Sequence, residues 1–524
     1  MPENFKQRVF HGIESIIGRE RADDISRKFF SRNPGFDLES VNRHHRERHG
    51  VTSEIPPNEL IESIFSIYYG RADAQSIVPT VDTPASRSFI PYTKGATSAI
   101  VFNFFRMNYG IRDPILYRIS IIHDETVYFS SQFLLPGNGV KLVQDPATEA
   151  SSEDLPANGI LLVEAFHPRI RTRMNELRYF GLYAGSGSIC GVHSFYFNTG
   201  RFVEFNHPGT RAFGPKTKTA EYYDHFGRVN DLTTDAAHGL GHFRASLPTL
   251  APGFVGVRSA LRALSAVWHD NIAGTLVPPA NAPEEKERCV QALYIPNFKL
   301  NAPLLLAHER EIGYRPNKMT LTLRNSSGGL LGEVHHEQGR AVDTIDTRRL
   351  FSGLDFDGPA FLYIDLGRDV GDFQSRPVNF LQIYYTCGDG LADQVHSHMT
   401  FGVHNDVDSK NRSYRCRKFA PYIRDENYRW EYSLVNFSGG PANKDADVSV
   451  RVMTDTGREA VFSHSLPTQG IGVIKGDSIV NAVEGDISKC AIVQIEHETT
   501  NYNGSWHVTD IRSGHVGTDH FSGG

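Results

Sequence analysis

The chain repeats one short pattern three times, an aromatic residue two positions before a proline: Phe89-Ile90-Pro91, Tyr294-Ile295-Pro296 and Phe419-Ala420-Pro421. About 100 residues after each proline, a segment containing glycine ends in a histidine, and these closing histidines are His193, His396 and His520. A pattern that returns with nearly constant unit length is the signature of one small domain used repeatedly. The sequence therefore predicts three copies of one domain.

Each predicted copy contains short runs rich in β-branched and aromatic residues, separated by turn residues. In the first copy such runs include 98–105, 115–122 and 159–166. Several short strands with turns every eight to twelve residues are typical of an antiparallel β-sandwich. We predict a mainly β protein with three repeated antiparallel β-sandwich domains, at residues 86–197, 293–403 and 418–522.

Two further regions interrupt this pattern. Residues 1–75 carry apolar residues at helical spacing, which predicts a helical N-terminal cap. Residues 198–290 form a long insertion between the first two copies, and we expect it to be mixed in structure. Its expected helix lies near 255–269, because one helical stripe would hold Val257, Leu261, Leu264 and Trp268.

The bulk properties bear on partners and location. Lys and Arg number 54 against 60 Asp and Glu, so the net charge is −6, and both signs are dispersed. This distribution is unlike a nucleic-acid-binding footprint. No apolar run is long enough for membrane insertion, and the N-terminus has no apolar leader. The five cysteines stand singly, which argues against a disulfide framework and predicts reduced thiols and a cytoplasmic location.

Glycine-rich loops precede the closing histidines, and we consider them candidate ligand-binding loops. Glycine allows a backbone to approach a ligand closely and to present its N–H groups. The candidate residues are Gly185, Gly187, His193, Gly388, Asp389, Gly514 and His520. The alternative is structural: tight hairpins need glycine for positive φ, and the histidines then bond to a neighbouring strand.

The second copy adds a candidate metal site. His396 and His398 are two positions apart, so on a β-strand both imidazoles point to the same face and can bind one ion. With Gly390, the stretch resembles the first half of the cupin motif, G-x5-H-x-H. The glutamate expected a few positions later is absent, and His404 would substitute as a ligand. A divalent transition metal is the cofactor that this site would take.

A second histidine group lies in the insertion. His238 and His242 have the H-x3-H spacing that aligns two ligands on a helix, and His225 stands nearby. Gly239 and Gly241 between them disfavour a stable helix, so a solvated loop is the alternative.

These observations leave two hypotheses for function. The first is a non-catalytic multi-sandwich binding or assembly protein that recognises a protein or glycan partner. The second is a metal-dependent enzyme whose histidine site lies in the second copy or in the insertion. The absence of a complete catalytic motif favours the first, and the second is the alternative; the sequence gives no oligomeric state.

The sequence also raises the question of whether the closing histidines share one site. Neighbouring domains of about 100 residues have centres on the order of 25 Å apart. Consecutive domains more often pack along the chain than close a ring. We therefore expect His193, His396 and His520 to occupy equivalent places in separate, independent sites.

Overall fold

The structure is a computed structural model of the 524-residue chain, and it describes part of residues 86–523. The described ranges are 86–103, 114–136, 139–146, 154–166, 179–185, 188–196, 209–212, 219–224, 226–234, 242–245, 253–258, 266–268, 288–308, 318–337, 342–369, 381–387, 391–396, 401–404, 416–436, 446–466, 471–497 and 502–523. The predicted cap at 1–75 lies outside them. Within them no helix is long and apolar enough to cross a membrane.

The first group of strands, which we call unit 1, forms a five-stranded and a four-stranded antiparallel sheet. Their orders are β4-β3-β6-β1-β9 and β5-β2-β7-β8. The strands are β1 (Ser86–Thr93), β2 (Thr97–Phe102), β3 (Ile115–His123), β4 (Thr126–Leu135), β5 (Val140–Val143), β6 (Asn158–Phe166), β7 (Tyr179–Gly185), β8 (Ser188–His193) and β9 (Phe195–Tyr196).

Unit 2 comprises β16 to β24 and again forms a five-stranded and a four-stranded sheet. The orders are β19-β18-β21-β16-β24 and β20-β17-β22-β23. The strands are β16 (Arg288–Ile295), β17 (Pro303–His308), β18 (Lys318–Asn325), β19 (Leu330–Glu337), β20 (Val342–Asp346), β21 (Ala360–Asp369), β22 (Leu381–Cys387), β23 (Leu391–His396) and β24 (Phe401–His404).

Unit 3 comprises β25 to β33 with the orders β28-β27-β30-β25-β33 and β29-β26-β31-β32. Its strands are β25 (Cys416–Ile423), β26 (Tyr428–Asn436), β27 (Ala446–Thr454), β28 (Glu459–Leu466), β29 (Ile471–Lys475), β30 (Cys490–His497), β31 (Tyr502–Asp510), β32 (Val516–His520) and β33 (Ser522–Gly523). Counted from its own first strand, each unit therefore has the same order. The prediction of a mainly β fold built from antiparallel sheets is confirmed.

The residue patterns explain where individual strands sit in a sheet. The central strand β6 is almost uniformly apolar and is buried along nearly its whole length. The edge strand β4 instead alternates between exposed and half-buried residues. A strand covered on both faces needs apolar residues on both, whereas an edge strand needs them on one face only.

The insertion is built of strands wherever the structure describes it. They form one six-stranded sheet in the order β10-β13-β12-β11-β14-β15. Its strands are β10 (Gly209–Ala212), β11 (Thr219–Asp224), β12 (Val229–Thr234), β13 (His242–Ala245), β14 (Gly253–Arg258) and β15 (Ala266–Trp268). This sheet joins unit 1 through Tyr223, which packs in the core of that unit, and through Asp124, whose backbone N–H donates to the Gly227 carbonyl.

The prediction of a helix near 255–269 is wrong, because β14 and β15 occupy 253–258 and 266–268. Val255 and Val257 are β-branched and two positions apart, so they also fit one face of a strand. The residues of β14 pair on one side with β11 and on the other with β15. This long-range pairing outweighs the helical spacing of the apolar residues.

The described residues contain three short helices, all within units 2 and 3. Asn297 caps α6 (Phe298–Asn301) by accepting from the Leu300 N–H at 3.0 Å. Asp346 caps α7 (Thr347–Leu350) in the same way, through the Arg348 N–H. The third helix is α8 (Gly476–Ala482). Side chains that accept from the first free N–H groups make such short helices possible.

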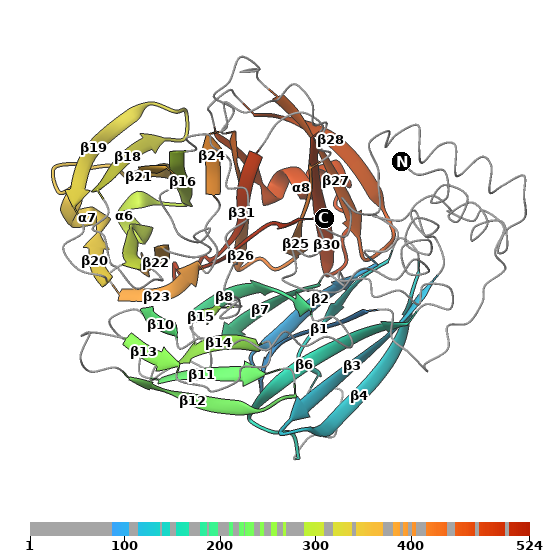
Figure 1. Cartoon of the computed structure of the whole chain (residues 1–524). Helices are drawn as coiled ribbons and strands as arrows, with labels where there is room; N and C mark the ends of the chain where they lie inside the picture. Colours follow the sequence, from blue (N-terminus) through green and yellow to red (C-terminus); the bar gives the residue numbers. More distant parts are fainter. Residues whose placement is uncertain are drawn as a thin grey trace, which may run out of the picture.

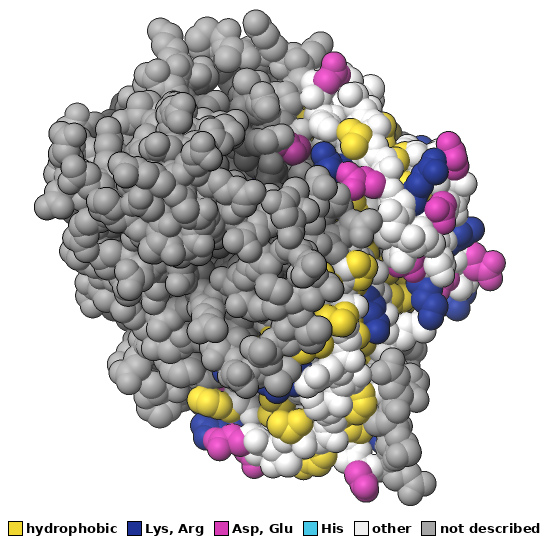
Figure 2. Space-filling view, turned by 90° about the vertical axis from the view of Figure 1, so that its right-hand side faces the viewer, with side chains coloured by type: hydrophobic (Ala, Val, Ile, Leu, Met, Phe, Trp, Pro, Cys, Tyr) yellow, Lys and Arg dark blue, Asp and Glu magenta, His cyan; other side chains and the backbone are white. Residues whose placement is uncertain are grey.

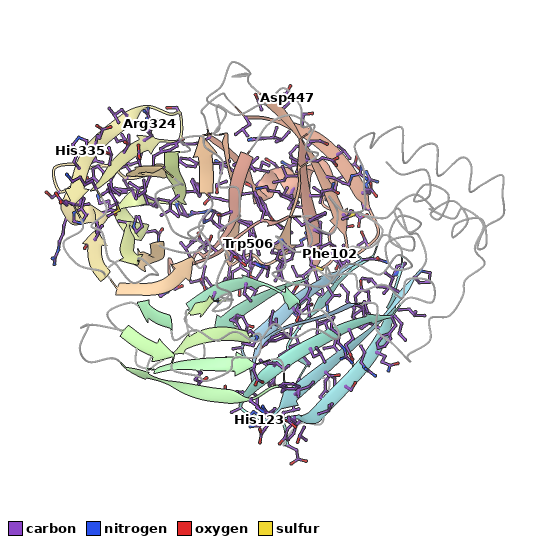
Figure 3. All side chains as sticks on the ribbon, viewed as in Figure 1. Phe102, His123, Arg324, His335, Asp447 and Trp506 are labelled. Atoms are coloured by element: carbon purple, nitrogen blue, oxygen red, sulfur yellow. The ribbon has the colours of Figure 1, made fainter. Side chains whose placement is uncertain are left out.

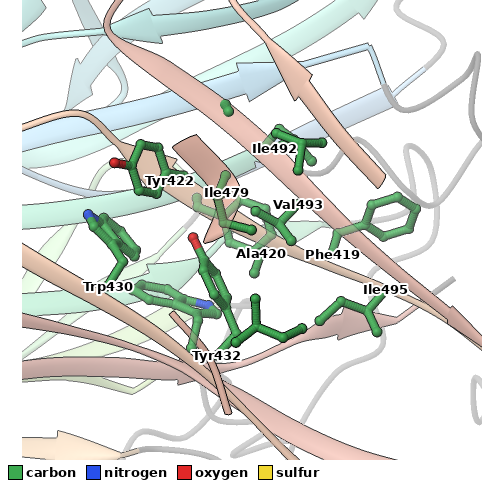
Figure 4. Packing of buried hydrophobic residues seen from close by; sticks show 14 of the residues in the cluster. Phe419, Ala420, Tyr422, Trp430, Tyr432, Ile479, Ile492, Val493 and Ile495 are labelled. Atoms are coloured by element: carbon green, nitrogen blue, oxygen red, sulfur yellow. The ribbon is translucent and has the colours of Figure 1, made fainter. Parts of the chain in front are cut away.

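The three units form three lobes around a common centre (Figure 1), with unit 2 and unit 3 above and unit 1 with the insertion below. The core of unit 3 includes Trp430, Tyr432 and Ile479 (Figure 4) and continues across the boundary into unit 1. From unit 1 the same buried cluster takes side chains of the four-stranded sheet, namely Ile100, Phe102, Val140, Phe180, Leu182 and Ile189. Units 1 and 3 are therefore joined by a continuous apolar core.

Candidate functional site

The strands that end in the closing histidines meet at the centre of the molecule. Each of β8, β23 and β32 is the edge strand of a four-stranded sheet, and each contacts the other two. We call this meeting of three edge strands the junction. The insertion reaches it too, because β15 contacts β8 and β23. The expectation that these segments lie apart in independent sites is wrong at the level of the strands.

The physical reason lies in the sheet edges. An edge strand presents unpaired backbone N–H and C=O groups, which must be covered or solvated. Three four-stranded sheets whose edges face one another cover those edges mutually. This mutual covering favours the ring arrangement, which sequence spacing does not reveal.

A buried histidine and a buried carboxylate join units 1 and 3 at the junction. Asp519 Oδ2 accepts from the backbone N–H of His193 at 2.6 Å and lies 2.8 Å from its ring Nδ1. His193 is 7% exposed and Asp519 is 0% exposed. A carboxylate that takes two short hydrogen bonds from one residue fixes the edge of β8 against β32.

A close approach of backbone to ring supports this contact. An added Cβ at Gly191 on β8 would lie 2.0 Å from Cη2 of Trp506 on β31. Trp506 is fully buried, and its ring centroid lies 6.2 Å from that of Phe180 in an edge arrangement. Phe102 and Phe419 make a further ring contact across the same boundary at 5.7 Å. Figure 3 shows Trp506 and Phe102 where the lobes meet.

Units 2 and 3 are joined by a polar and aromatic group. The Tyr294 hydroxyl donates to Glu431 Oε1 at 3.0 Å, and its ring centroid lies 5.0 Å from that of His507. His507 Nε2 lies 3.1 Å from the Ser433 hydroxyl. The side-chain amide of Asn301 on α6 donates to the Gly514 carbonyl at 3.0 Å.

Burial shifts the protonation of Glu431. Desolvation raises the pKa of this carboxyl above its ordinary value, although Arg429, the Tyr294 hydrogen bond and Lys475 each act to lower it. The native state thus holds the proton more tightly than the unfolded chain does. The stabilisation that results is complete below the unfolded pKa and is lost as pH rises through the native pKa.

Replacing Glu431 by glutamine should therefore change stability in a pH-dependent way. Glutamine is neutral at every pH and keeps an oxygen that accepts from Tyr294. Relative to the native protein, Glu431→Gln should become more stable as pH rises through the range above the ordinary glutamate pKa, until the native carboxyl is fully ionised. Melting temperatures of both proteins across this range measure the difference. A difference that stays constant with pH would show that Glu431 carries no raised pKa in the native state.

The predicted loop residues fall into two groups. Gly514 lies in the turn between β31 and β32 with φ of 72°, and its N–H donates to the Asp510 carbonyl. Gly185 ends β7, and His193 ends β8 at the junction. The others, Gly187, Gly388 and Asp389, lie outside the described residues, as does the side chain of His520. Ligand binding by these loops stays a prediction.

The histidine-based metal sites fall largely outside the described residues. His398 is among those not described, and His396 and His404 are placed only as strand backbone, in β23 and β24. In the insertion, His225 and His238 lie outside the described residues, and so does the side chain of His242. Among the described side chains, no group of three or more His, Cys, Asp or Glu is arranged to hold a metal ion. Metal binding therefore stays untested.

The sequence does not reveal the residue that bonds to His193, nor the Tyr294–Glu431 contact between units 2 and 3. Asp519 is 326 residues away from His193 along the chain. In the sequence, Tyr294 stands out only as part of a repeated tripeptide, and Glu431 belongs to no recognisable pattern. The described polar side chains that join units 1 and 3 and units 2 and 3 are buried and contact one another, so they hold the three units in one arrangement.

Comparisons with known proteins give no family and no curated relative. No family model and no curated protein matches the chain. One solved structure aligned to it is a tetra-tandem repeat in the extending region of a large adhesion protein, with 10% identity over 85% of this chain and 96% of that chain, at a TM-score of 0.08. Another is native E. coli alpha-2-macroglobulin, with 9% identity over 86% of this chain and 27% of that chain, at a TM-score of 0.09. At these scores neither alignment bears on fold or function.

Proposed function

We propose that the protein is a non-catalytic binding or assembly protein that recognises a protein or glycan partner. The single observation that carries this proposal is the use of buried polar side chains in contacts between the units. His193, Asp519 and the Tyr294–Glu431 pair each make contacts between units. Histidine, carboxylate and tyrosine side chains can act in catalysis when they line an open cleft. Here they instead make buried contacts that hold three β units together.

In this proposal each unit is a copy of one β-sandwich, at 86–197, 293–403 and 418–522. The strand order shared by the three units supports this reading. Pro91 and Pro421 also occupy matching places: each lies in the first strand of its unit and pairs with an isoleucine of the sixth strand. Pro296 directly follows the first strand of unit 2.

A fixed junction gives the outer surfaces of the units fixed relative positions. A partner that engages two units at once binds the second with a high effective concentration, provided the geometry does not change. The thiol of Cys490 is buried and in no disulfide, which supports a reducing location such as the cytoplasm. The dispersed charge supports a partner other than nucleic acid.

The proposal predicts that partner binding depends on the junction. Partners would be identified by glycan array and by in-cell cross-linking with the full chain. Binding would then be compared between the native protein and Trp506→Ala, which loosens the junction without touching an outer surface. We expect affinity for a multivalent partner to fall by about tenfold or more. Gly353→Ala, at an open position, is the matched control.

Elemental analysis tests the enzyme alternative. A stoichiometric transition metal that is lost in His396→Ala and His398→Ala, together with a metal-dependent turnover, would replace the binding proposal with the metal-dependent enzyme. Metal-free protein that binds its partner normally would support the proposal.

A further inference from the structure

Strand β4 is a sheet edge of unusual composition. It is ten residues long and, among the described residues, pairs with β3 alone. Its sequence, Thr126 to Leu135, holds no charged residue and no proline. Val127, Tyr128 and Leu134 are 56%, 44% and 53% exposed. A long, uncharged edge with exposed apolar side chains is a template for pairing with another strand.

The equivalent strands of the other units provide an internal comparison. Strands β19 and β28 hold the same edge position in their own five-stranded sheets. Strand β19 carries Glu333 and Glu337, and β28 carries Glu459. Charged side chains on an edge strand oppose pairing with a second sheet. Among these three equivalent strands, β4 alone carries no charged residue.

Figure 2 shows the side of the molecule to which β4 belongs. Hydrophobic side chains gather over the lower part of its described surface, where unit 1 lies, and Lys, Arg, Asp and Glu are concentrated over the upper part. Charged side chains also lie at the lower margin of this surface, so the absence of charge on the edge itself is given by the sequence of β4.

The sequence of β4 is complementary to itself in the antiparallel direction. Around Ser131 as the centre, Phe129 of one strand would face Phe133 of the other, and Ser130 would face Gln132. Phe129 and Phe133 pair with Ile121 and Tyr117 of β3 and pack against the core, so both lie on the same face. Aromatic pairs and polar pairs at facing positions are stabilising cross-strand contacts.

We propose that β4 pairs antiparallel with β4 of a second copy of this chain, which joins two five-stranded sheets about a twofold axis near Ser131. The observations favour a second copy as the occupant, because residues of β4 face compatible residues when the strand pairs with a second β4. An isologous contact requires such self-complementarity. Strand β4 carries no charge by which it could select an unrelated extended peptide. The proposal uses a different surface from the junction and does not rest on the proposed function.

Sedimentation equilibrium of the full chain over a wide concentration range tests the proposal. The native protein should be a dimer. In the double variant Ser130→Lys, Gln132→Lys, lysines face each other twice across the axis, so dimerisation should weaken by at least about tenfold. The matched control is Ser463→Lys, Ser465→Lys on β28, at exposed positions of the equivalent strand, and it should leave the dimer unchanged.

A charge-complement experiment separates a lost interface from a damaged strand. The Ser130 hydroxyl lies 3.2 Å from that of Ser120, so its replacement also removes a local contact. Mixing the double lysine variant with Ser130→Glu, Gln132→Glu should restore a mixed dimer. A native protein that is monomeric throughout, a dimer that persists in the double lysine variant, or a mixture that fails to associate would each overturn the proposal. Partner binding by the monomeric variant reports separately on the proposed function.

Discussion

Replacing Trp506 by alanine is expected to lower the free energy of unfolding by about 3–5 kcal/mol, the usual cost of removing a fully buried large aromatic side chain. Trp506 is 0% exposed and contacts the rings of Phe180 in unit 1 and Trp430 in unit 3. The substitution therefore opens a cavity where two units share one core. Chemical denaturation of both proteins measures the loss.

Trp506→Phe is the matched control for this cavity. The indole N–H of Trp506 has no hydrogen-bond partner among the described residues, so phenylalanine removes ring volume without breaking a hydrogen bond. Its cost should be clearly smaller than that of alanine. Equal stability of native protein and Trp506→Ala would mean that Trp506 is not buried between the units.

Gly191→Ala should have the second largest effect. The added Cβ would lie 2.0 Å from Cη2 and 2.6 Å from Cζ3 of Trp506, which is closer than non-bonded carbon atoms approach one another. Either strand β8 or the indole must move, and such overpacking costs about 1–3 kcal/mol. Gly353→Ala, where nothing lies within 4 Å of the new Cβ, should be nearly neutral.

A double-mutant cycle shows whether the cost of Gly191→Ala arises from this contact. Because phenylalanine is smaller than tryptophan, Trp506→Phe should relieve part of the clash. The double variant should then be more stable than the sum of the single effects predicts. Simple additivity would place the origin of the Gly191 effect elsewhere.

The mainly β fold could be predicted because its signals are local. Short apolar strands and frequent turns are visible within each segment of about ten residues. The insertion misled this reading at 255–269, since Val257, Leu261 and Trp268 fit a helical stripe while Val255 and Val257 also fit a strand. Pairing of β14 with β11 and β15 decided the outcome, and pairing partners cannot be read from a local pattern.

The junction could be predicted only in part. His193 was a candidate because it closes a repeated pattern. Its partner Asp519 was not, since two residues 326 positions apart meet only when the units close into a ring. Ring closure depends on how three sheet edges face one another, which is a property of packing between units. Sequence spacing contains no information on it.

Residue-resolved hydrogen exchange at the His193 amide shows whether the edge strand β8 of unit 1 is covered by unit 3. This N–H belongs to an edge strand and finds its acceptor, Asp519 Oδ2, in a different unit. We expect strong protection of this amide in the native protein and faster exchange in Asp519→Ala, with the amides inside the β2–β7 pairing unchanged. Rapid exchange of the His193 amide in the native protein would contradict it, because the edge of β8 would then be open to water.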